Sequence, residues 1–195
     1  MKLRIDGKEH KIKIEKRKYK NLKEMLRIVE FKYLFPERVI KSIEVEGKAI
    51  HPEYLGSLND VTDINIITDS TVNFLKNHIE LSIIALDSVN GAIEMIIETF
   101  EASEDLAKLH INYIADSVMK TVEILEKGSV FLPIVEGTDE AILEIEEKIL
   151  RLNEIKEADE MVKFLESDFI KGVERWKTFL VKILSTINNS SMETH

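Results

Sequence analysis

The segment from residue 42 to residue 68 constrains the fold of this chain more than any other stretch. Ile43 and Val45 alternate with polar residues, which is typical of a strand with one buried face, and a Glu-Gly pair then supplies a turn. A short apolar return, an irregular loop and a last apolar strand at 64–67 follow. The segment predicts three strands of one small sheet and a domain boundary near Thr68.

Residues 1–41 supply the remaining elements of this sheet. Leu3 and Ile5 alternate with basic residues, and Asp6-Gly7 predicts a hairpin turn because Gly tolerates a positive φ. Asn21 is a good N-cap for a helix that ends before Pro36. The apolar positions expected on the return strand and on the buried face of the helix are His10, Ile12, Ile14, Leu22, Met25, Leu26, Val29 and Tyr33.

The order strand, strand, helix, strand, short strand, strand resembles the ubiquitin-like β-grasp fold over residues 1–69. The resemblance implies a helix lying across a sheet, and it concerns the fold alone, because β-grasp domains have many unrelated functions. Ubiquitin-like modifiers need a free Gly-Gly terminus, whereas this chain continues past Thr68. Ferredoxin-like members need four cysteines, and the sequence has none. The resemblance therefore implies a docking or scaffold module.

Residues 70–188 show apolar positions at helical spacing in four stretches and predict an antiparallel four-helix bundle. We therefore expect an α+β protein with domains 1–69 and 70–188 and a disordered tail, 189–195. The pattern leaves open whether Asn90-Gly91 interrupts the first helix. Trp176 lies in the apolar stripe of the last helix, and we expect it to pack in the core.

The first bundle helix carries more apolar surface than one buried stripe requires. A helix that is apolar on most sides is either central or shared with a partner. Both explanations stay open at this point: burial within its own bundle, or an interface that includes a homodimer contact. The candidate protein-binding residues on this helix are Phe74, Leu81, Ile84 and Met95.

The segment 129–137 is too apolar for an ordinary surface loop, and Pro133 disfavours a helix through its centre. Its apolar side chains either close one end of the bundle core or form an exposed partner site. Phe131, Leu132 and Ile134 are therefore added to the candidate protein-binding residues.

Charge differs between the two halves. Residues 1–69 contain 15 Lys/Arg and 12 Asp/Glu, a net charge of +3, and residues 70–195 contain 12 and 24, a net charge of −12. The basic patch of the first half lies on a solvated sheet face, contacts the acidic half of the same protein, or binds nucleic acid, and the acidic half disfavours nucleic acid. The residues of this patch are Lys11, Lys13, Lys16, Arg17 and Lys18.

The chemistry-bearing motifs that would indicate an enzyme are absent from the sequence. With no cysteine, thiolate metal sites and cysteine nucleophiles are excluded. His78 and His110 lack the preceding Glu of a dimetal bundle, and no Gly-rich phosphate loop occurs. We expect no cofactor, no metal site and no catalytic residue.

No apolar run is long enough for a signal peptide or a spanning helix, so we expect a soluble, cytoplasmic protein without membrane partners. The Lys/Glu/Ile-rich composition is typical of a warm-growing prokaryote. The expected function is a non-enzymatic protein-interaction module. Its architecture resembles that of bacterial export or assembly chaperones, which shield an amphipathic partner helix. Nucleic-acid binding through the basic patch is the alternative.

Overall fold

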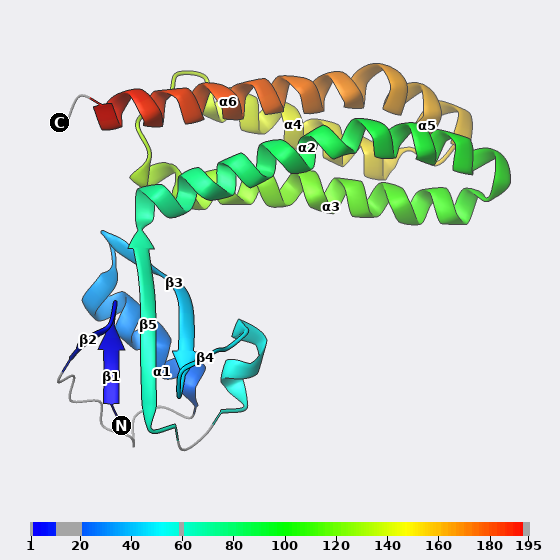
Figure 1. The fold of residues 1–195 in the computed structure, drawn as a ribbon. Helices are drawn as coiled ribbons and strands as arrows, with labels where there is room; N and C mark the ends of the chain where they lie inside the picture. Colours follow the sequence, from blue (N-terminus) through cyan, green and yellow to red (C-terminus); the bar gives the residue numbers. More distant parts are fainter. Residues whose placement is uncertain (1, 11–20, 59–60, 193–195) are drawn as a thin grey trace. The chain divides into compact units, whose positions relative to one another are not determined.

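The computed structural model describes residues 2–10, 21–58 and 61–192. These residues form an α+β protein in which a mixed five-stranded sheet precedes a series of α-helices (Figure 1). The chain divides into two compact units, Met1–Phe74 and Leu75–His195. The domain limits 1–69 and 70–188 stay predictions.

The sheet has the spatial order β2-β1-β5-β3-β4. The central strand β5 pairs parallel with β1 and antiparallel with β3, and the two short strands pair antiparallel at the edges. This mixed sheet is compatible with a β-grasp-like arrangement. The strands are β1 (Lys2–Ile5), β2 (Lys8–Glu9), β3 (Arg38–Val45), β4 (Lys48–Ala49) and β5 (Asp63–Ser70).

Both predicted hairpin turns occur, and both use left-handed backbone at their two central residues. Asp6 and Gly7 have φ values of 50° and 76°, and Glu46 and Gly47 have values of 52° and 79°. Two successive positive φ angles are what a two-residue type I′ turn requires, since this turn matches the twist of the flanking strands. The β1–β2 and β3–β4 hairpins therefore follow directly from local sequence.

Helix α1 (Leu22–Val29) begins where the sequence predicted, because the Asn21 side chain accepts a hydrogen bond from the Glu24 N–H at 3.0 Å. A π-helical turn, Glu30–Leu34, follows it. The extra residue of a π turn moves the buried position from i+4 to i+5. The placement of Tyr33 in the core was therefore wrong: Leu34 is buried instead, and Tyr33 is 56% exposed.

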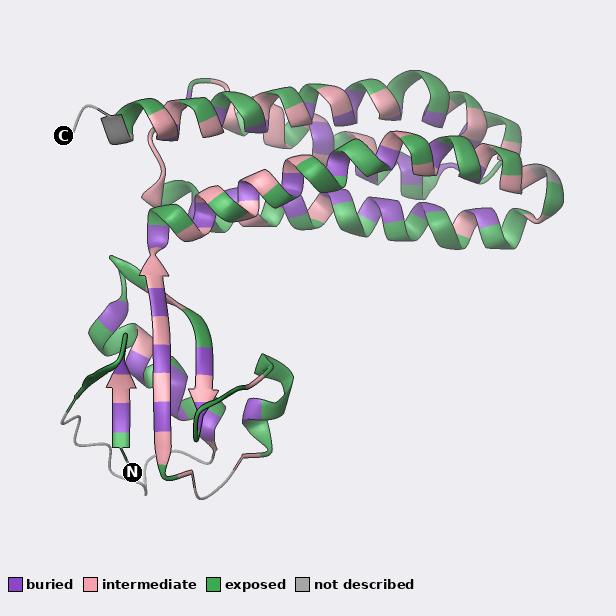
Figure 2. Cartoon of the chain, viewed as in Figure 1, coloured by how far each residue is buried: buried purple, intermediate pink, exposed green. Residues whose placement is uncertain are grey.

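One hydrophobic core lies between α1 and the sheet. Along β5 buried residues alternate with half-buried ones, as Figure 2 shows, so a single face of the strand contributes to the core. The central Ile64 and Ile66 are fully buried. The buried residues of this core are Leu3, Ile5, Leu22, Met25, Leu26, Val29, Leu34, Ile43, Val45, Leu55, Ile64 and Ile66.

The second unit contains five α-helices in the described part of the chain, whereas the sequence predicted a bundle of four. The reason is a π-helical turn, Leu165–Phe169, which divides the last predicted helix into two. The helices are α2 (Thr71–Ala102), α3 (Glu104–Gly128), α4 (Thr138–Glu154), α5 (Ala158–Phe164) and α6 (Ile170–Met192).

Helix α2 runs without interruption through Asn90-Gly91, which decides the question that the sequence left open. Gly91 is exposed, and a Cβ added there would meet no atom within 4 Å, so no close crossing requires this glycine. Val72, an apolar residue in the first turn of α2, is 36% exposed. At the end of the chain, α6 continues to Met192, four residues into the predicted tail.

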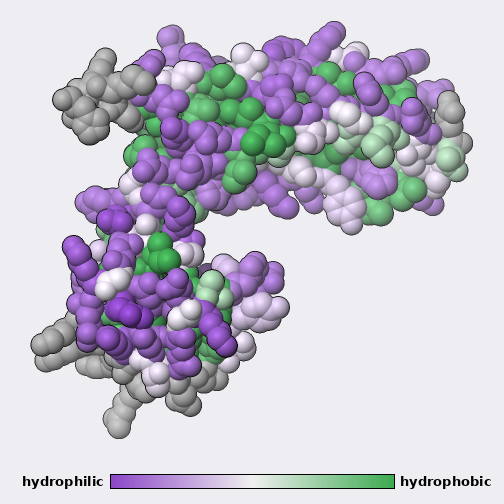
Figure 3. All heavy atoms as spheres, in the orientation of Figure 1, coloured by the Kyte–Doolittle hydropathy of each residue, from purple (hydrophilic) through white to green (hydrophobic). Residues whose placement is uncertain are grey.

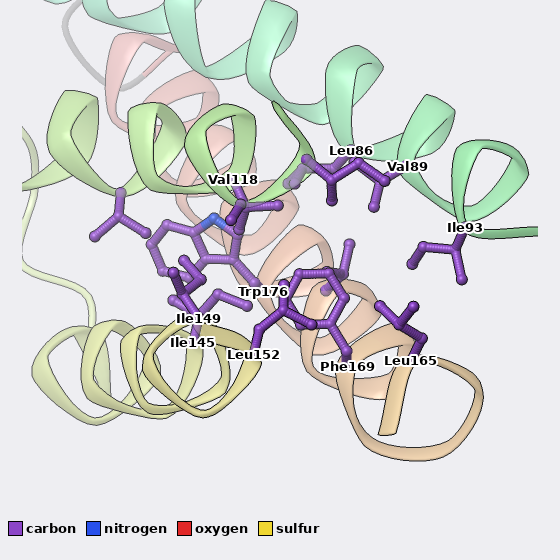
Figure 4. Close-up of a cluster of buried hydrophobic side chains, with 14 of the residues drawn as sticks. Leu86, Val89, Ile93, Val118, Ile145, Ile149, Leu152, Leu165, Phe169 and Trp176 are labelled. Carbon is purple, nitrogen blue, oxygen red and sulfur yellow. The ribbon is translucent and has the colours of Figure 1, made fainter. Parts of the chain in front are cut away.

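Trp176 lies at the centre of the helical core, as predicted. Its side chain is 2% exposed and is surrounded by apolar residues of α3, α4 and α6 (Figure 4). The indole Nε1–H donates to Thr121 Oγ1 at 2.8 Å, and the Thr121 hydroxyl donates to the Val118 carbonyl at 2.7 Å. The only polar group of the tryptophan is thereby satisfied inside an apolar core.

Candidate protein-binding groove

Helices α2 and α3 leave a groove of about 490 Å³ between them. The groove is mostly apolar, and its polar side chains are mainly small hydroxyl residues. Its lining residues are Ala85, Ser88, Val89, Ala92, Met95, Ile96, Thr99, His110, Tyr113, Ile114 and Ser117.

The hollow exists because α2 presents small side chains to it. Ala85, Ser88 and Ala92 are spaced by three and four residues, so they lie on one face of the helix. None of them fills the space beside α3. The larger Met95 and Tyr113 remain 69% and 61% exposed. The groove is therefore bordered by flexible and aromatic side chains of the kind found at protein interfaces.

The serine and threonine hydroxyl groups in the groove donate to carbonyls of their own helices. Thr99 Oγ1 donates to the Met95 carbonyl at 2.7 Å, and Ser117 Oγ donates to the Tyr113 carbonyl at 2.7 Å. A hydroxyl that already donates to its own backbone loses little when a neighbour covers it. An apolar side chain could enter the groove without leaving these donors unpaired.

Further exposed apolar residues stand three or four positions from groove residues on both helices, so they are surface neighbours of the groove. On α2, Leu81 and Ile84 are 61% and 62% exposed, and on α3 Leu106 and Leu109 are 46% and 47% exposed. Figure 3 shows apolar side chains gathered over part of the helical unit, with hydrophilic ones beside them. An exposed apolar surface that spans several turns of two helices is typical of an interaction site.

The structure places the four candidate residues of α2 differently. Met95 lines the groove, and Leu81 and Ile84 are exposed on the same helix. Phe74 is half-buried and is the last residue of the first unit. Three of the four thus belong to exposed surface of the helical unit, and Phe74 does not.

The three candidates between α3 and α4 lie in a separate segment, away from the α2–α3 groove residues in the sequence. Leu132 and Ile134 line a second hollow of about 270 Å³. Ile134 is 99% exposed, whereas Phe131 and Leu132 are half-buried and Val135 belongs to the helical core. Part of the segment therefore closes the core, as one of the two alternatives predicted, and part of it is exposed; a partner site at the exposed part stays a prediction.

The basic patch Lys11, Lys13, Lys16, Arg17 and Lys18 lies outside the described residues. Nucleic-acid binding through this patch stays a prediction from the sequence.

Sequence reasoning missed the α3 side of the groove. Leu106, His110, Tyr113 and Ser117 recur every three or four residues beside the buried stripe of α3, and this second stripe was the available signal. The more regular buried stripe of α3 accounts for its core face and gives no indication of a second apolar face.

A second feature missed from the sequence is an aromatic pair in the first unit. The rings of Phe31 and Phe35 stack with centroids 6.5 Å apart and an interplanar angle of 14°. Phe31 is 75% exposed and Phe35 48% exposed. The signal was the run of aromatic residues directly before Pro36.

The face of the sheet opposite the core carries several paired polar groups. Arg4 forms an ion pair with Asp63 at 2.9 Å, and the Asn65 amide donates to Glu44 at 2.9 Å. These residues alternate along β1, β3 and β5 with the buried ones. These pairs satisfy polar side chains along the face of the sheet that does not contact α1.

Asp6, in the β1–β2 turn, connects that hairpin to β5. Its carboxylate accepts from the Thr68 N–H at 2.9 Å and from the Thr68 hydroxyl at 2.8 Å, and Arg38 lies 3.0 Å away. Partial burial alone would raise the pKa of Asp6, but the two hydrogen bonds and the charge of Arg38 outweigh it. The net result is a pKa below the ordinary value of 3.8.

The part of the chain that the structure describes contains no group of three His, Asp or Glu residues arranged to hold a metal ion. Within the same ranges, no helix combines the length and the hydropathy needed to cross a bilayer.

Comparisons with protein-family models, with curated proteins and with solved structures find no match to this chain.

Proposed function

We propose that this protein is a non-enzymatic interaction module whose helical unit binds a segment of another protein in the α2–α3 groove. The observation that carries the proposal is the exposed apolar surface on both sides of that groove, from Leu81 to Thr99 on α2 and from Leu106 to Ser117 on α3. In the same proposal, the first unit is a ubiquitin-like β-grasp domain that serves as a docking or scaffold element.

The dimensions of the surface favour a helical segment over a small molecule. Eighteen residues separate Leu81 from Thr99, which corresponds to about 27 Å along a helix axis. The hollow alone has the volume of a small-molecule pocket, which is about 300–1,000 Å³. A small ligand bound there would leave the apolar residues beside the hollow uncovered. An amphipathic helix uses anchors at i, i+3, i+4 and i+7, and such anchors would reach both the hollow and the apolar residues beside it.

Site-directed variants can test the proposal, because the residues concerned are exposed and their substitution spares the core. Met95→Glu places a charge in the groove, and Leu150→Glu is the matched control on α4, where Leu150 is 61% exposed. Each tagged variant is used to isolate partners from a lysate of the source organism. We expect a protein that co-purifies with the wild type and with Leu150→Glu but is lost with Met95→Glu.

Two results would contradict the proposal. One is a protein partner that Met95→Glu and Leu150→Glu retain equally, which would place the contact elsewhere. The other is the recovery of a stoichiometric small molecule with no protein, which would make the groove a ligand pocket.

A further inference from the structure

Acidic residues border the apolar surface of the groove on both helices. Glu98 lies three residues after Met95 on α2, and Asp116 lies three residues after Tyr113 on α3, so each is a surface neighbour of a groove residue. Both are exposed. The groove therefore has a carboxylate close to each of its two sides.

The charges of the two helices as a whole have the same sign. Helix α2 contains five acidic residues and one Lys, and helix α3 contains five acidic residues and three Lys. Two of the α3 lysines form i,i+4 ion pairs within the helix, Lys108 with Glu104 and Lys127 with Glu123. The third, Lys120, lies one turn beyond Ser117 at one end of the groove. Asp87 of α2 is also paired, with Lys177, but carboxylates still outnumber basic side chains on both helices of the groove.

We propose that the segment bound in the α2–α3 groove is an amphipathic α-helix with Lys or Arg on both margins of its apolar stripe. This inference rests on the proposed function. Its apolar residues enter the groove, and its basic residues face Glu98 and Asp116. Complementary charge at the margins of an apolar contact selects the partner and its orientation more than it adds affinity.

The same charges disfavour the other occupants. A second copy of this chain that used the same surface would bring carboxylates against carboxylates, which is repulsive at the short distances of an interface. Nucleic acids and anionic lipid surfaces carry the same sign of charge as the groove margins. A basic helix is the occupant whose charge and shape both match.

Two synthetic peptides test the inference directly. Each has 18 residues, the same leucine stripe at i, i+3, i+4 and i+7 spacing, and a fluorescein label; one has Lys at every marginal position and the other has Glu. Fluorescence anisotropy gives both dissociation constants for the full-length protein. At low salt we expect the Lys peptide to bind about tenfold more tightly or better, and added salt should reduce this ratio because the marginal charges are exposed.

Charge-reversal variants test whether the preference for the Lys peptide over the Glu peptide arises at the groove. Glu98→Lys/Asp116→Lys should weaken binding of the Lys peptide and strengthen binding of the Glu peptide. Glu147→Lys/Glu166→Lys changes the net charge equally at exposed positions of α4 and the π-helical turn, and it should leave the ratio within about twofold of wild type. A photo-crosslinking residue in place of Met95 should capture the Lys peptide, and one in place of Leu150 should not.

The possible failures are distinguishable. If the two peptides bind equally and crosslink at Met95, the groove binds helices but the basic-partner inference is wrong. Equal effects of the two double variants would likewise overturn it, because they would indicate attraction by net charge alone. If neither peptide binds or crosslinks at Met95, both the inference and the proposed function are overturned.

Discussion

The two units of this protein each have their own core but differ in what they leave exposed. The sheet of the first unit buries one face under α1 and covers the other with paired polar groups such as Arg4 and Asp63. The helical unit also has a closed core around Trp176, yet it leaves a second apolar surface between α2 and α3 exposed to solvent. Core formation therefore accounts for most of the apolar strand positions of the first unit, whereas several apolar positions of α2 and α3 remain exposed.

The largest expected effect tests the core of the helical unit. Trp176→Ala removes a fully buried ring and its hydrogen bond to Thr121, and we expect a loss of about 3–5 kcal/mol in the free energy of unfolding. Urea unfolding followed by circular dichroism at 222 nm measures it. Leu150→Ala, at an exposed position, is the control and should change stability by less than about 0.5 kcal/mol. A loss below about 1 kcal/mol for Trp176→Ala would show that the ring does not support the core.

The second prediction tests whether the core of the first unit can be weakened without affecting the core of the helical unit. Ile66→Ala in β5 should destabilise the first unit by about 2–5 kcal/mol, since Ile66 is fully buried. The neighbouring Ile67 lies on the opposite face and is half-buried, so Ile67→Ala is a matched control with a smaller cost. Dispersion of the sheet amide signals in NMR reports the first unit, and emission of Trp176, the only tryptophan, reports the second. If Ile66→Ala also shifts the Trp176 emission to the red, the two cores are not independent.

The third prediction concerns the hydrogen bonds that connect the β1–β2 turn to β5. Asp6→Asn keeps a side chain that tolerates positive φ but removes the charge, and we expect a loss of about 1 kcal/mol at neutral pH for this partly exposed group. Because the pKa of Asp6 is lowered in the folded state, its stabilisation is full above pH 3.8 and is lost as the pH falls through the lower folded value. Urea unfolding of the sheet at pH 7 and below pH 3 should therefore show the difference between wild type and variant shrinking in acid. A difference that is the same at both pH values would exclude the charge as its cause.

The smallest expected effect concerns the continuity of α2. Gly91→Ala should stabilise the helical unit by about 0.5–1 kcal/mol, because the position is helical, exposed and without close neighbours. Gly137→Ala is the contrasting variant: Gly137 has a φ of 86°, so the added Cβ is strained and stability should fall. Thermal unfolding followed at 222 nm measures both. A destabilised Gly91→Ala would indicate that α2 needs a flexible point at its centre.

Much of this protein follows from local sequence. The Asp6-Gly7 and Glu46-Gly47 turns, the Asn21 cap and the Ser103 cap, which accepts from the Leu106 N–H at 3.4 Å, depend on residues within four positions of one another. Such features are predictable because their geometry is set by the backbone and by short-range hydrogen bonds. The buried stripe of the last helical segment, including Trp176, was predictable for a similar reason, since only one face of it is continuously apolar.

The candidate site was only half predictable. Leu81, Ile84 and Met95 were recognised as surplus apolar residues on α2, but the sequence could not choose between burial and exposure. Tyr113, their counterpart on α3, was not recognised at all. A groove is a property of two helices, and its depth depends on which faces meet and which small residues, such as Ala92, fall opposite each other.

The sequence by itself determined the hairpin turns, the helix caps and most strands and buried stripes, because each depends on periodicity or on contacts between near neighbours. The return strand is the exception: β2 ends at Glu9, His10 is exposed, and Ile12 and Ile14 lie outside the described residues. Only the tertiary structure decided that Leu34 replaces Tyr33 in the first core, that a π-helical turn divides the last helix at Leu165–Phe169, and that Met95 faces a groove. The physical reason is the same in each case. An apolar side chain is buried where other side chains pack against it, and the choice between two such positions is made by packing between segments distant in the sequence.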